Sequence, residues 1–290
     1  MVPKFSLPIG IYEKALPQAS DWHERLMLGA QAGYDYVEIS IDESEERLAR
    51  LDWPASAKRD LRRAIENTGI PIKTLCLSGH RKYPLGSSSP ELRTRALEIL
   101  YKAICFAADI GIRIVQVMGY DVFYESSSEE TRASFLEGLA YGCKWASEAG
   151  VILGLENVDH ETVDSVEKAL WYISQLNSPW LQLYPDMGNL AAAGYDPADE
   201  LRKGAGHILA IHVKDALPGV VRGVPLGSGI VRFSSVFEAL AQIQFWGPLT
   251  IEMWSHMEPH RDAFQAIIHA RQFVGKLVEN VLVAKIHTSP

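Results

Sequence analysis

The chain has 290 residues, 47% of them apolar and 22% charged, with a formal net charge of −8. This composition is typical of a globular protein with a large buried core, and it excludes a disordered or fibrous chain. The acidic balance and the lack of a block rich in Lys and Arg also argue against nucleic acid as a partner.

Eight short apolar runs separated by helical patterns are the strongest organisational signal. Glycines that end helices precede four of the runs, at Gly33, Gly69, Gly111 and Gly150. The runs are almost continuously apolar, as in parallel strands that helices cover on both faces. In chain order the predicted strands cover 8–13, 36–41, 72–78, 114–119, 151–156, 181–186, 208–213 and 249–254, and a last helix follows from about 260 to 280.

Eight such units predict an α/β fold, a closed (β/α)8 or TIM barrel that occupies 1–290 as one domain. A doubly wound open sheet is the alternative. That fold favours a glycine-rich phosphate turn after the first strand, and the segment IYEKAL supplies none. We find no linker or low-complexity stretch that would divide the chain.

Four consecutive predicted strands end in a carboxylate or an imidazole. Glu156 closes VILGLE, Asp186 closes LQLYPD, His212 follows ILAI, and Glu252 follows PLTI. In a barrel the carboxyl ends of the strands surround the active site, so these side chains should meet. Three clustered carboxylates need a cation to offset their desolvation and repulsion, and this donor set suits one divalent Zn, Mn, Co or Mg ion.

Each of these residues also has an ordinary structural interpretation. A single Glu at a strand end is more often solvated or paired than a ligand, and His212 alone fits a core histidine as well as a ligand. The recurrence of such groups on four successive strands is what favours the metal site. Polar residues near other predicted strand ends, including Glu38, Arg81, Asn157 and Asp215, are expected to be supporting or surface groups.

A smaller set of residues is predicted to contact a substrate. His80 and Lys214 lie within two residues of predicted mouth positions, and Asn189 follows Asp186 closely. Gly227, Ser228 and Gly229 precede the last strand and could present backbone amides to a phosphate, although an ordinary flexible turn explains them equally well.

Long motifs in the chain resemble the xylose-isomerase-like sugar isomerase and epimerase barrels, and within them the L-ribulose-5-phosphate 3-epimerases. The resemblance covers nearly the whole chain. It rests on IGIYEKALP at 9–17, RLDWP at 50–54, LCLSGHRKYPLGS at 75–87, QLYPDMGNL at 182–190, HVKD at 212–215 and IEMWS at 251–255.

The resemblance implies an isomerase that inverts carbon 3 of a ketopentose 5-phosphate, L-xylulose or L-ribulose 5-phosphate, through an enediolate. It implies metal ligation by the same four residues, with Glu156 and Glu252 as the proton carriers. Two segments depart from the family pattern. Residues 227–229 are Gly-Ser-Gly where the family has an acidic residue between the two glycines, and residues 156–159 are Glu-Asn-Val-Asp where a more apolar Glu-x-Met-Asp is typical. These departures concern the choice of substrate.

Other functions share parts of this pattern. An isomerase or epimerase of another keto sugar or of hydroxypyruvate would keep the four ligands, and a non-catalytic sugar-phosphate sensor would keep the pocket. An endonuclease of this fold would need three metals, more His ligands and a basic face, which the acidic charge opposes. We expect a small-molecule sugar phosphate as the partner. Association into a homodimer is compatible with the fold.

The location and the cysteines complete the expectations. The start, MVPKFSLPIG, lacks the pattern of a signal peptide, and no apolar run has the length of a membrane span, so we expect a cytoplasmic protein with no membrane partner. Cys76, Cys105 and Cys143 contain no C-x-x-C pair. They are expected to be buried small apolar residues rather than disulfide partners or zinc ligands.

Overall fold

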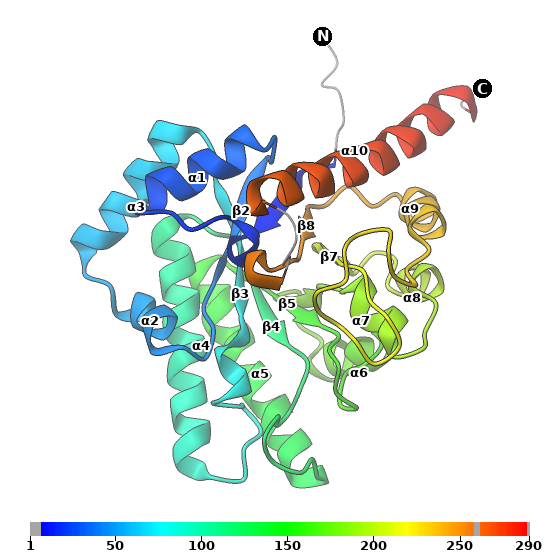
Figure 1. The fold of residues 1–290 in the computed structure, drawn as a ribbon. Helices are drawn as coiled ribbons and strands as arrows, with labels where there is room; N and C mark the ends of the chain where they lie inside the picture. The colour runs from blue at the N-terminus through cyan, green and yellow to red at the C-terminus, as the bar shows by residue number, and fades with distance from the viewer. Residues whose placement is uncertain (1–6, 258–261, 289–290) are drawn as a thin grey trace.

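A computed structural model describes residues 7–257 and 262–288, with side chains described up to residue 280. Eight parallel strands lie at the centre of the molecule and helices surround them (Figure 1). They pair in the order β6-β5-β4-β3-β2-β1-β8-β7. The strands are β1 (Ile9–Tyr12), β2 (Tyr36–Ser40), β3 (Ile72–Leu77), β4 (Ile114–Met118), β5 (Ile152–Glu156), β6 (Leu181–Leu183), β7 (Ile211–Val213) and β8 (Leu249–Ile251).

Single bridges between β6 and β7 close the sheet into a barrel. Leu183 pairs with Ile208, and Asp186 pairs with His212. The amide of His212 donates to the carbonyl of Pro185 at 2.9 Å. The predicted (β/α)8 barrel is therefore confirmed, with its closure made by isolated bridges instead of a continuous ladder.

The helices follow the strands in the expected alternation. The α-helices are α1 (Trp22–Gln31), α2 (Glu45–Leu48), α3 (Ala55–Thr68), α4 (Pro90–Ile110), α5 (Glu129–Ala149), α6 (Val166–Leu176), α7 (Met187–Ala192), α8 (Pro197–Lys203), α9 (Phe233–Gln242) and α10 (Ala263–Thr288). Short 3-10 helices are η1 (Glu13–Ala15), η2 (Ala49–Asp52), η3 (Ser78–Arg81) and η4 (Ser255–Met257). The longest helix, α10, crosses the β1 and β8 side of the barrel and runs past α9 (Figure 1).

Local sequence explains where the long helices begin and end. Ser128 and Thr131 form a reciprocal capping box at the start of α5. The predicted helix stops are confirmed, since Gly111 and Gly150 follow α4 and α5 with φ of 92° and 66°. A side chain disfavours this left-handed conformation, so glycine is suited to both positions.

The last three strands are shorter than the sequence predicts. Strand β6 ends at Leu183, because Pro185 has no N–H to continue a ladder and Asp186 already caps α7. Strand β7 begins only at Ile211, and β8 ends at Ile251. Asp186 and Glu252 thus lie just beyond their strands, where the backbone turns over the barrel mouth.

A polar network fills part of the barrel interior. Tyr36 and Tyr184 each place a hydroxyl 2.8 Å from Thr250 Oγ1, and Tyr184 donates to Glu38 Oε2 at 2.7 Å. Glycine makes room for these rings, because a Cβ on Gly10 would lie 2.3 Å from the Tyr36 ring. The interior beneath the site is therefore packed with hydrogen-bonded tyrosines as well as aliphatic side chains.

The expectations about membrane spans and about the cysteines can be compared with the structure. Within the described residues, no helix is long and apolar enough to cross a membrane. The three cysteines are free; Cys76 and Cys143 are buried as predicted. Cys105 is only partly buried, contrary to the prediction.

Candidate active site

Glu156, Asp186, His212 and Glu252 converge at the carboxyl end of the barrel. Each offers one ligand atom, and the four atoms lie within 4.8 Å of one another. Glu156 ends β5, His212 is the middle residue of β7, and Glu252 follows β8. Four side chains that are separated by up to 96 positions in the sequence thus form one cluster.

Backbone hydrogen bonds fix the position of Asp186. Its Oδ1 accepts the amide of Asn189 at 2.7 Å and so caps α7. The side chain of Asn157 accepts the Asp186 amide at 2.9 Å and donates to the Asp186 carbonyl at 3.0 Å. The remaining oxygen, Oδ2, is buried and accepts no hydrogen bond from the described residues. This oxygen faces a cation, the ammonium of Lys214 at 2.9 Å.

His212 connects the cluster to the barrel interior. Its Nδ1 lies 2.7 Å from Glu156 Oε1, and its Nε2 lies 2.7 Å from Glu38 Oε1. The same Nδ1 is 3.8 Å from Asp186 Oδ2 and 4.0 Å from Glu252 Oε2. Nδ1 is therefore the ring nitrogen that faces the three carboxylates.

Lys214 contributes a second cation to the cluster. Its ammonium lies 2.7 Å from Glu252 Oε2 and 2.9 Å from Asp186 Oδ2. Gln116 on β4 donates to the other oxygen of Glu156. Each ligand residue thus has a neighbouring side chain that holds one of its atoms in place.

The charge of the cluster fits a divalent ion. Four carboxyl groups (Glu38, Glu156, Asp186, Glu252) gather around His212 and Lys214, so acidic groups outnumber basic ones in the cluster. Uncompensated buried charge is costly, and a divalent cation would offset the repulsion among the carboxylates. Three carboxylates and one imidazole within 4.8 Å of one another therefore fit a single metal ion.

The protonation of the carboxylates depends on their positions. Burial raises the pKa of Asp186 to about 7 and also raises the pKa of Glu156. Burial would raise the pKa of Glu252 too, but Lys214 and His212 outweigh it and lower this pKa to about 2. For Lys214 burial opposes the charge, yet Asp186 and Glu252 raise its pKa. Glu252 is therefore the most acidic of these three carboxyl groups, and Lys214 keeps its proton.

A cavity of about 530 Å³ opens above the cluster. Glu156, Asn189, Lys214 and Glu252 lie at its floor. Side chains from other strand ends and loops also line it, including Tyr12, Ser78, Met118, Asp159, Trp254 and His256. A pocket of this size with convergent polar groups suits a small ligand.

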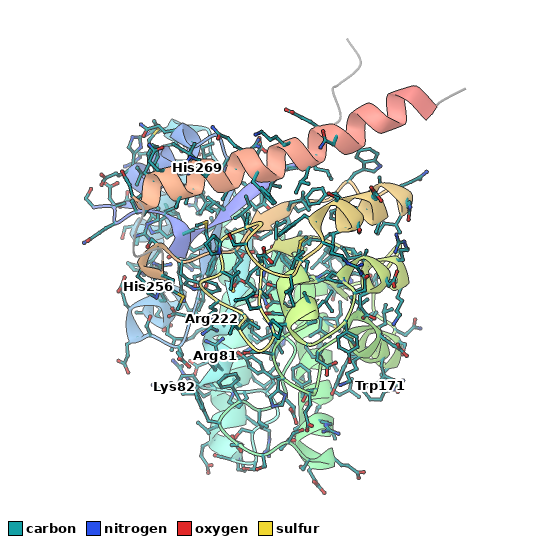
Figure 2. The ribbon with its side chains drawn as sticks, turned by 45° about the vertical axis from the view of Figure 1, so that its right-hand side comes forward. Arg81, Lys82, Trp171, Arg222, His256 and His269 are labelled. Carbon is teal, nitrogen blue, oxygen red and sulfur yellow. The ribbon has the colours of Figure 1, made fainter. Side chains whose placement is uncertain are left out.

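Two arginines at the cavity are available for an anion. Arg81 and Arg222 line it and, within the described part of the chain, neither forms an ion pair with a carboxylate. The Nε of Arg81 is buried without a hydrogen-bond partner. The guanidinium of Arg222 lies 5.4 Å from the Trp254 ring centroid. Figure 2 shows both arginines and His256 on the same face of the molecule.

Comparisons with known proteins identify the family of this chain. The model of the xylose isomerase-like TIM barrel family matches residues 27–273. The chain is 48% identical over 268 residues to the L-ribulose-5-phosphate 3-epimerases UlaE of Shigella boydii serotype 18 and Escherichia coli O139:H28. This alignment covers 92% of the chain and 94% of each relative.

The chain belongs to the xylose isomerase-like TIM barrel family. Solved structures share its fold at lower identity. A structure of L-ribulose 3-epimerase has a TM-score of 0.80 with 21% identity and covers 98% of both chains. The 3-keto-D-glucoside 4-epimerase YcjR of E. coli has a TM-score of 0.76 with 19% identity, covering 93% of this chain and 99% of its own. This member of the family is an enzyme of the isomerase class.

Two predicted substrate residues of this family member lie at the cavity. Asn189 and Lys214 both line it. Asn189 donates its side-chain amide to the Asn157 carbonyl at 3.0 Å, and Lys214 is held between Asp186 and Glu252. The ammonium of Lys214 is therefore engaged with the ligand cluster.

The structure places His80 away from the cavity, contrary to prediction. Its side chain is buried on η3, with Nε2 3.2 Å from the carbonyl of Ala96 on α4. Residues adjacent in sequence differ in orientation, because Arg81 lines the cavity whereas His80 points into the helix layer. The short 3-10 turn after β3 decides which side chain faces the ligand.

The predicted phosphate cradle at 227–229 is also contradicted. The amides of Gly227 and Gly229 both donate to Asp215 Oδ2, at 2.9 and 2.8 Å. The amide of Ser228 donates to the Pro225 carbonyl at 3.0 Å. The loop does bind an anion through its amides, but that anion is the carboxylate of Asp215 from the same loop.

Some residues of the site have no distinctive signal in the sequence. Arg222 reaches the cavity from a loop that shows no motif, whereas Tyr12 and Trp254 lie in the family motifs at 9–17 and 251–255 but were not singled out as site residues. Gln116 lies within an apolar strand and contacts Glu156. An isolated polar residue inside an otherwise apolar run is the one signal that could have identified Gln116.

Proposed function

We propose that this chain is a metal-dependent sugar-phosphate 3-epimerase that interconverts L-xylulose 5-phosphate and L-ribulose 5-phosphate. The observation that carries the proposal is the convergence of Glu156, Asp186, His212 and Glu252 within 4.8 Å, with Glu156 and Glu252 lining the cavity. Relatives that are 48% identical and named L-ribulose-5-phosphate 3-epimerase support this choice of substrate.

The four converging residues would hold one divalent ion, Zn, Mn, Co or Mg. When bound, such an ion polarises the substrate carbonyl and stabilises negative charge on its oxygen. The fixed Asp186 Oδ2 and the Nδ1 face of His212 provide two of the ligand atoms.

Glu156 and Glu252 are the proposed proton carriers. Both line the cavity, and they approach it from different strands, β5 and β8. Inversion at carbon 3 requires one group to remove the proton, leaving its electron pair in a planar enediolate, and another to return a proton to the opposite face. A carboxylate oxygen of either glutamate can accept or return the proton, and the group that removes it depends on which epimer is bound.

Lys214 supports this chemistry through its charge. Its ammonium lies 2.7 Å from Glu252 and keeps that carboxylate ionised. We assign the substrate phosphate instead to the two arginines without ion pairs in the described chain, Arg81 and Arg222. A guanidinium binds phosphate through paired N–H groups, and the buried Nε of Arg81 lacks a partner.

The first experiment tests the proton carriers. Glu156→Gln and Glu252→Gln should each nearly abolish epimerisation in protein with confirmed metal content, because Gln cannot carry the proton. In D2O, the variant without the reprotonating group should exchange the carbon 3 hydrogen without inversion, and the other variant should do neither. The roles should reverse with the epimeric substrate.

The matched control is Glu200→Gln on α8. Glu200 is equally buried, but it accepts the amide of Val166 and binds Lys203 on the far side of the barrel wall. Its replacement should leave turnover unchanged. Near-normal epimerisation by both metal-replete site variants would refute the assignment of Glu156 and Glu252.

The second experiment tests the phosphate. Arg81→Gln should raise KM for the ketopentose phosphate about tenfold or more while leaving kcat nearly unchanged, since the phosphate is bound alike in the ground and transition states. Turnover of the free ketopentose should not respond. The adjacent exposed Lys82 provides the control as Lys82→Gln (Figure 2). Equal KM values for wild type and Arg81→Gln would remove Arg81 from the phosphate site.

A further inference from the structure

Glu38 is a buried carboxylate that does not belong to the four converging ligands. It lies in the middle of β2 with no exposed surface and points into the barrel. Its Oε1 is 2.7 Å from His212 Nε2. Its Oε2 accepts the hydroxyls of Tyr184 and Thr74, each at 2.7 Å. Both oxygens are thus occupied, and none of these partners is solvent.

The surrounding strands restrict where this carboxylate can point. Thr74 is paired with Glu38 in the register of β2 and β3. Tyr184 approaches from the end of β6, and its ring contacts the His212 ring with centroids 4.7 Å apart at 69°. His212 is therefore held at Nε2 by Glu38 and along its ring by Tyr184, which leaves it a single orientation.

This arrangement decides which ring nitrogen is available to a metal. An imidazole binds a metal through an unprotonated nitrogen and keeps its proton on the other nitrogen. Nδ1 faces Glu156, Asp186 and Glu252, so Nε2 must carry the proton. A carboxylate at Nε2 accepts that proton's hydrogen bond, whereas an amide or hydroxyl could also donate and favour the opposite tautomer.

We infer that Glu38 is a positioning residue of the metal centre, which holds the Nε2–H of His212 so that Nδ1 is presented to the ion. The inference rests on the metal site proposed above and concerns a residue that contacts neither the ion nor the cavity. Glu38 does not line that cavity, so it acts through His212 alone.

Metal affinity of the purified, metal-stripped protein tests this role without any activity assay. Mn²⁺ and Zn²⁺ affinities would be measured by competition with a chromogenic chelator, together with far-UV circular dichroism of each metal-free variant. Glu38→Gln should weaken binding about 10- to 100-fold, the usual effect of removing such an outer partner. The control Glu200→Gln should bind within about twofold of wild type, well below that effect.

A shorter carboxylate separates positioning from packing. Glu38→Asp leaves a larger gap than Glu38→Gln but keeps a pure acceptor for the Nε2–H. Positioning predicts that the Asp variant binds metal more tightly than the Gln variant, although more weakly than wild type. A packing role predicts the reverse order, since Gln has nearly the shape of Glu.

The outcomes are distinguishable from failure of the proposed function. Wild-type affinity in folded Glu38→Gln, or tighter binding by Gln than by Asp, overturns the role of Glu38 and leaves the metal site intact. If Glu38→Gln does not fold, wild-type affinity in Glu38→Asp overturns it instead. Absence of metal binding by the wild type overturns both the metal site and this inference.

Discussion

Replacement of His80 should change how the stability of the protein depends on pH. Burial lowers the pKa of His80 to about 4 from an ordinary value of 6.5. One ring nitrogen contacts the Ala96 carbonyl, and Nδ1 has no hydrogen-bond partner in the described chain. The folded state therefore holds the neutral ring, and nothing nearby compensates a charge.

The sign of the effect follows from proton binding. Between pH 6.5 and pH 4 the unfolded chain protonates His80 and the folded protein does not, so the unfolded state binds more protons. The stability that the neutral ring contributes is present above pH 6.5 and is lost as the pH falls toward 4. Linkage with these two pKa values gives a loss of about 2 kcal/mol between pH 8 and pH 5.

Urea unfolding of wild type and His80→Gln at pH 8, 6.5 and 5, with EDTA present, measures this difference. Gln keeps a donor for the Ala96 carbonyl but does not titrate. The free energy of unfolding of the variant, relative to wild type, should rise by about 2 kcal/mol from pH 8 to pH 5. His207→Gln, at an exposed histidine, should show no such change.

The reasoning would be refuted if the difference in unfolding free energy between wild type and His80→Gln stayed constant from pH 8 to pH 5. In that case the folded and unfolded states would protonate His80 over the same pH range. The same variant also tests whether His80 contacts the substrate. Since His80 does not line the cavity, kcat and KM of His80→Gln should equal those of wild type at pH 8.

Three further predictions concern the loop, the core and the metal. Asp215→Ala removes the acceptor of four backbone amides, those of 216, 227, 229 and 231, and should cost about 2 kcal/mol or more of unfolding free energy; limited proteolysis should then cut within 217–229 first. Gly10→Ala places a Cβ 2.3 Å from the Tyr36 ring and should destabilise the barrel by at least about 1–3 kcal/mol in the same unfolding assay. EDTA should lower the Tm of the metal-replete protein in calorimetry, and added Mn²⁺ or Zn²⁺ should restore it, because an ion that binds only the folded state stabilises it.

The sequence by itself determined the architecture and the four converging residues. Continuous apolar runs after helix-ending glycines predict buried parallel strands, and eight of them predict closure. Because parallel strands end at the same rim, a polar residue just after each run must lie at the mouth. This geometric rule is why Glu156, Asp186, His212 and Glu252 could be grouped before any distance was known.

Only the tertiary structure decided which side chains reach the ligand cavity. His80 and Arg81 are neighbours in sequence, yet the 3-10 turn after β3 directs one into the helix layer and the other to the cavity. The amides of Gly227 and Gly229 are consumed by Asp215, twelve or more positions away. The direction of these side chains and amides depends on the backbone conformation of loops. Loops have no periodic sequence pattern from which that conformation could be predicted.

The role of Glu38 shows the same limit inside the barrel. A Glu within YVEIS indicates a polar residue on a buried strand, but its partners Tyr184 and His212 come from strands 146 and 174 positions away. Contacts across a closed barrel depend on strand register and inward orientation. The sequence therefore predicted the residues at the rim, and the packed interior decided which of them are held in place and by what.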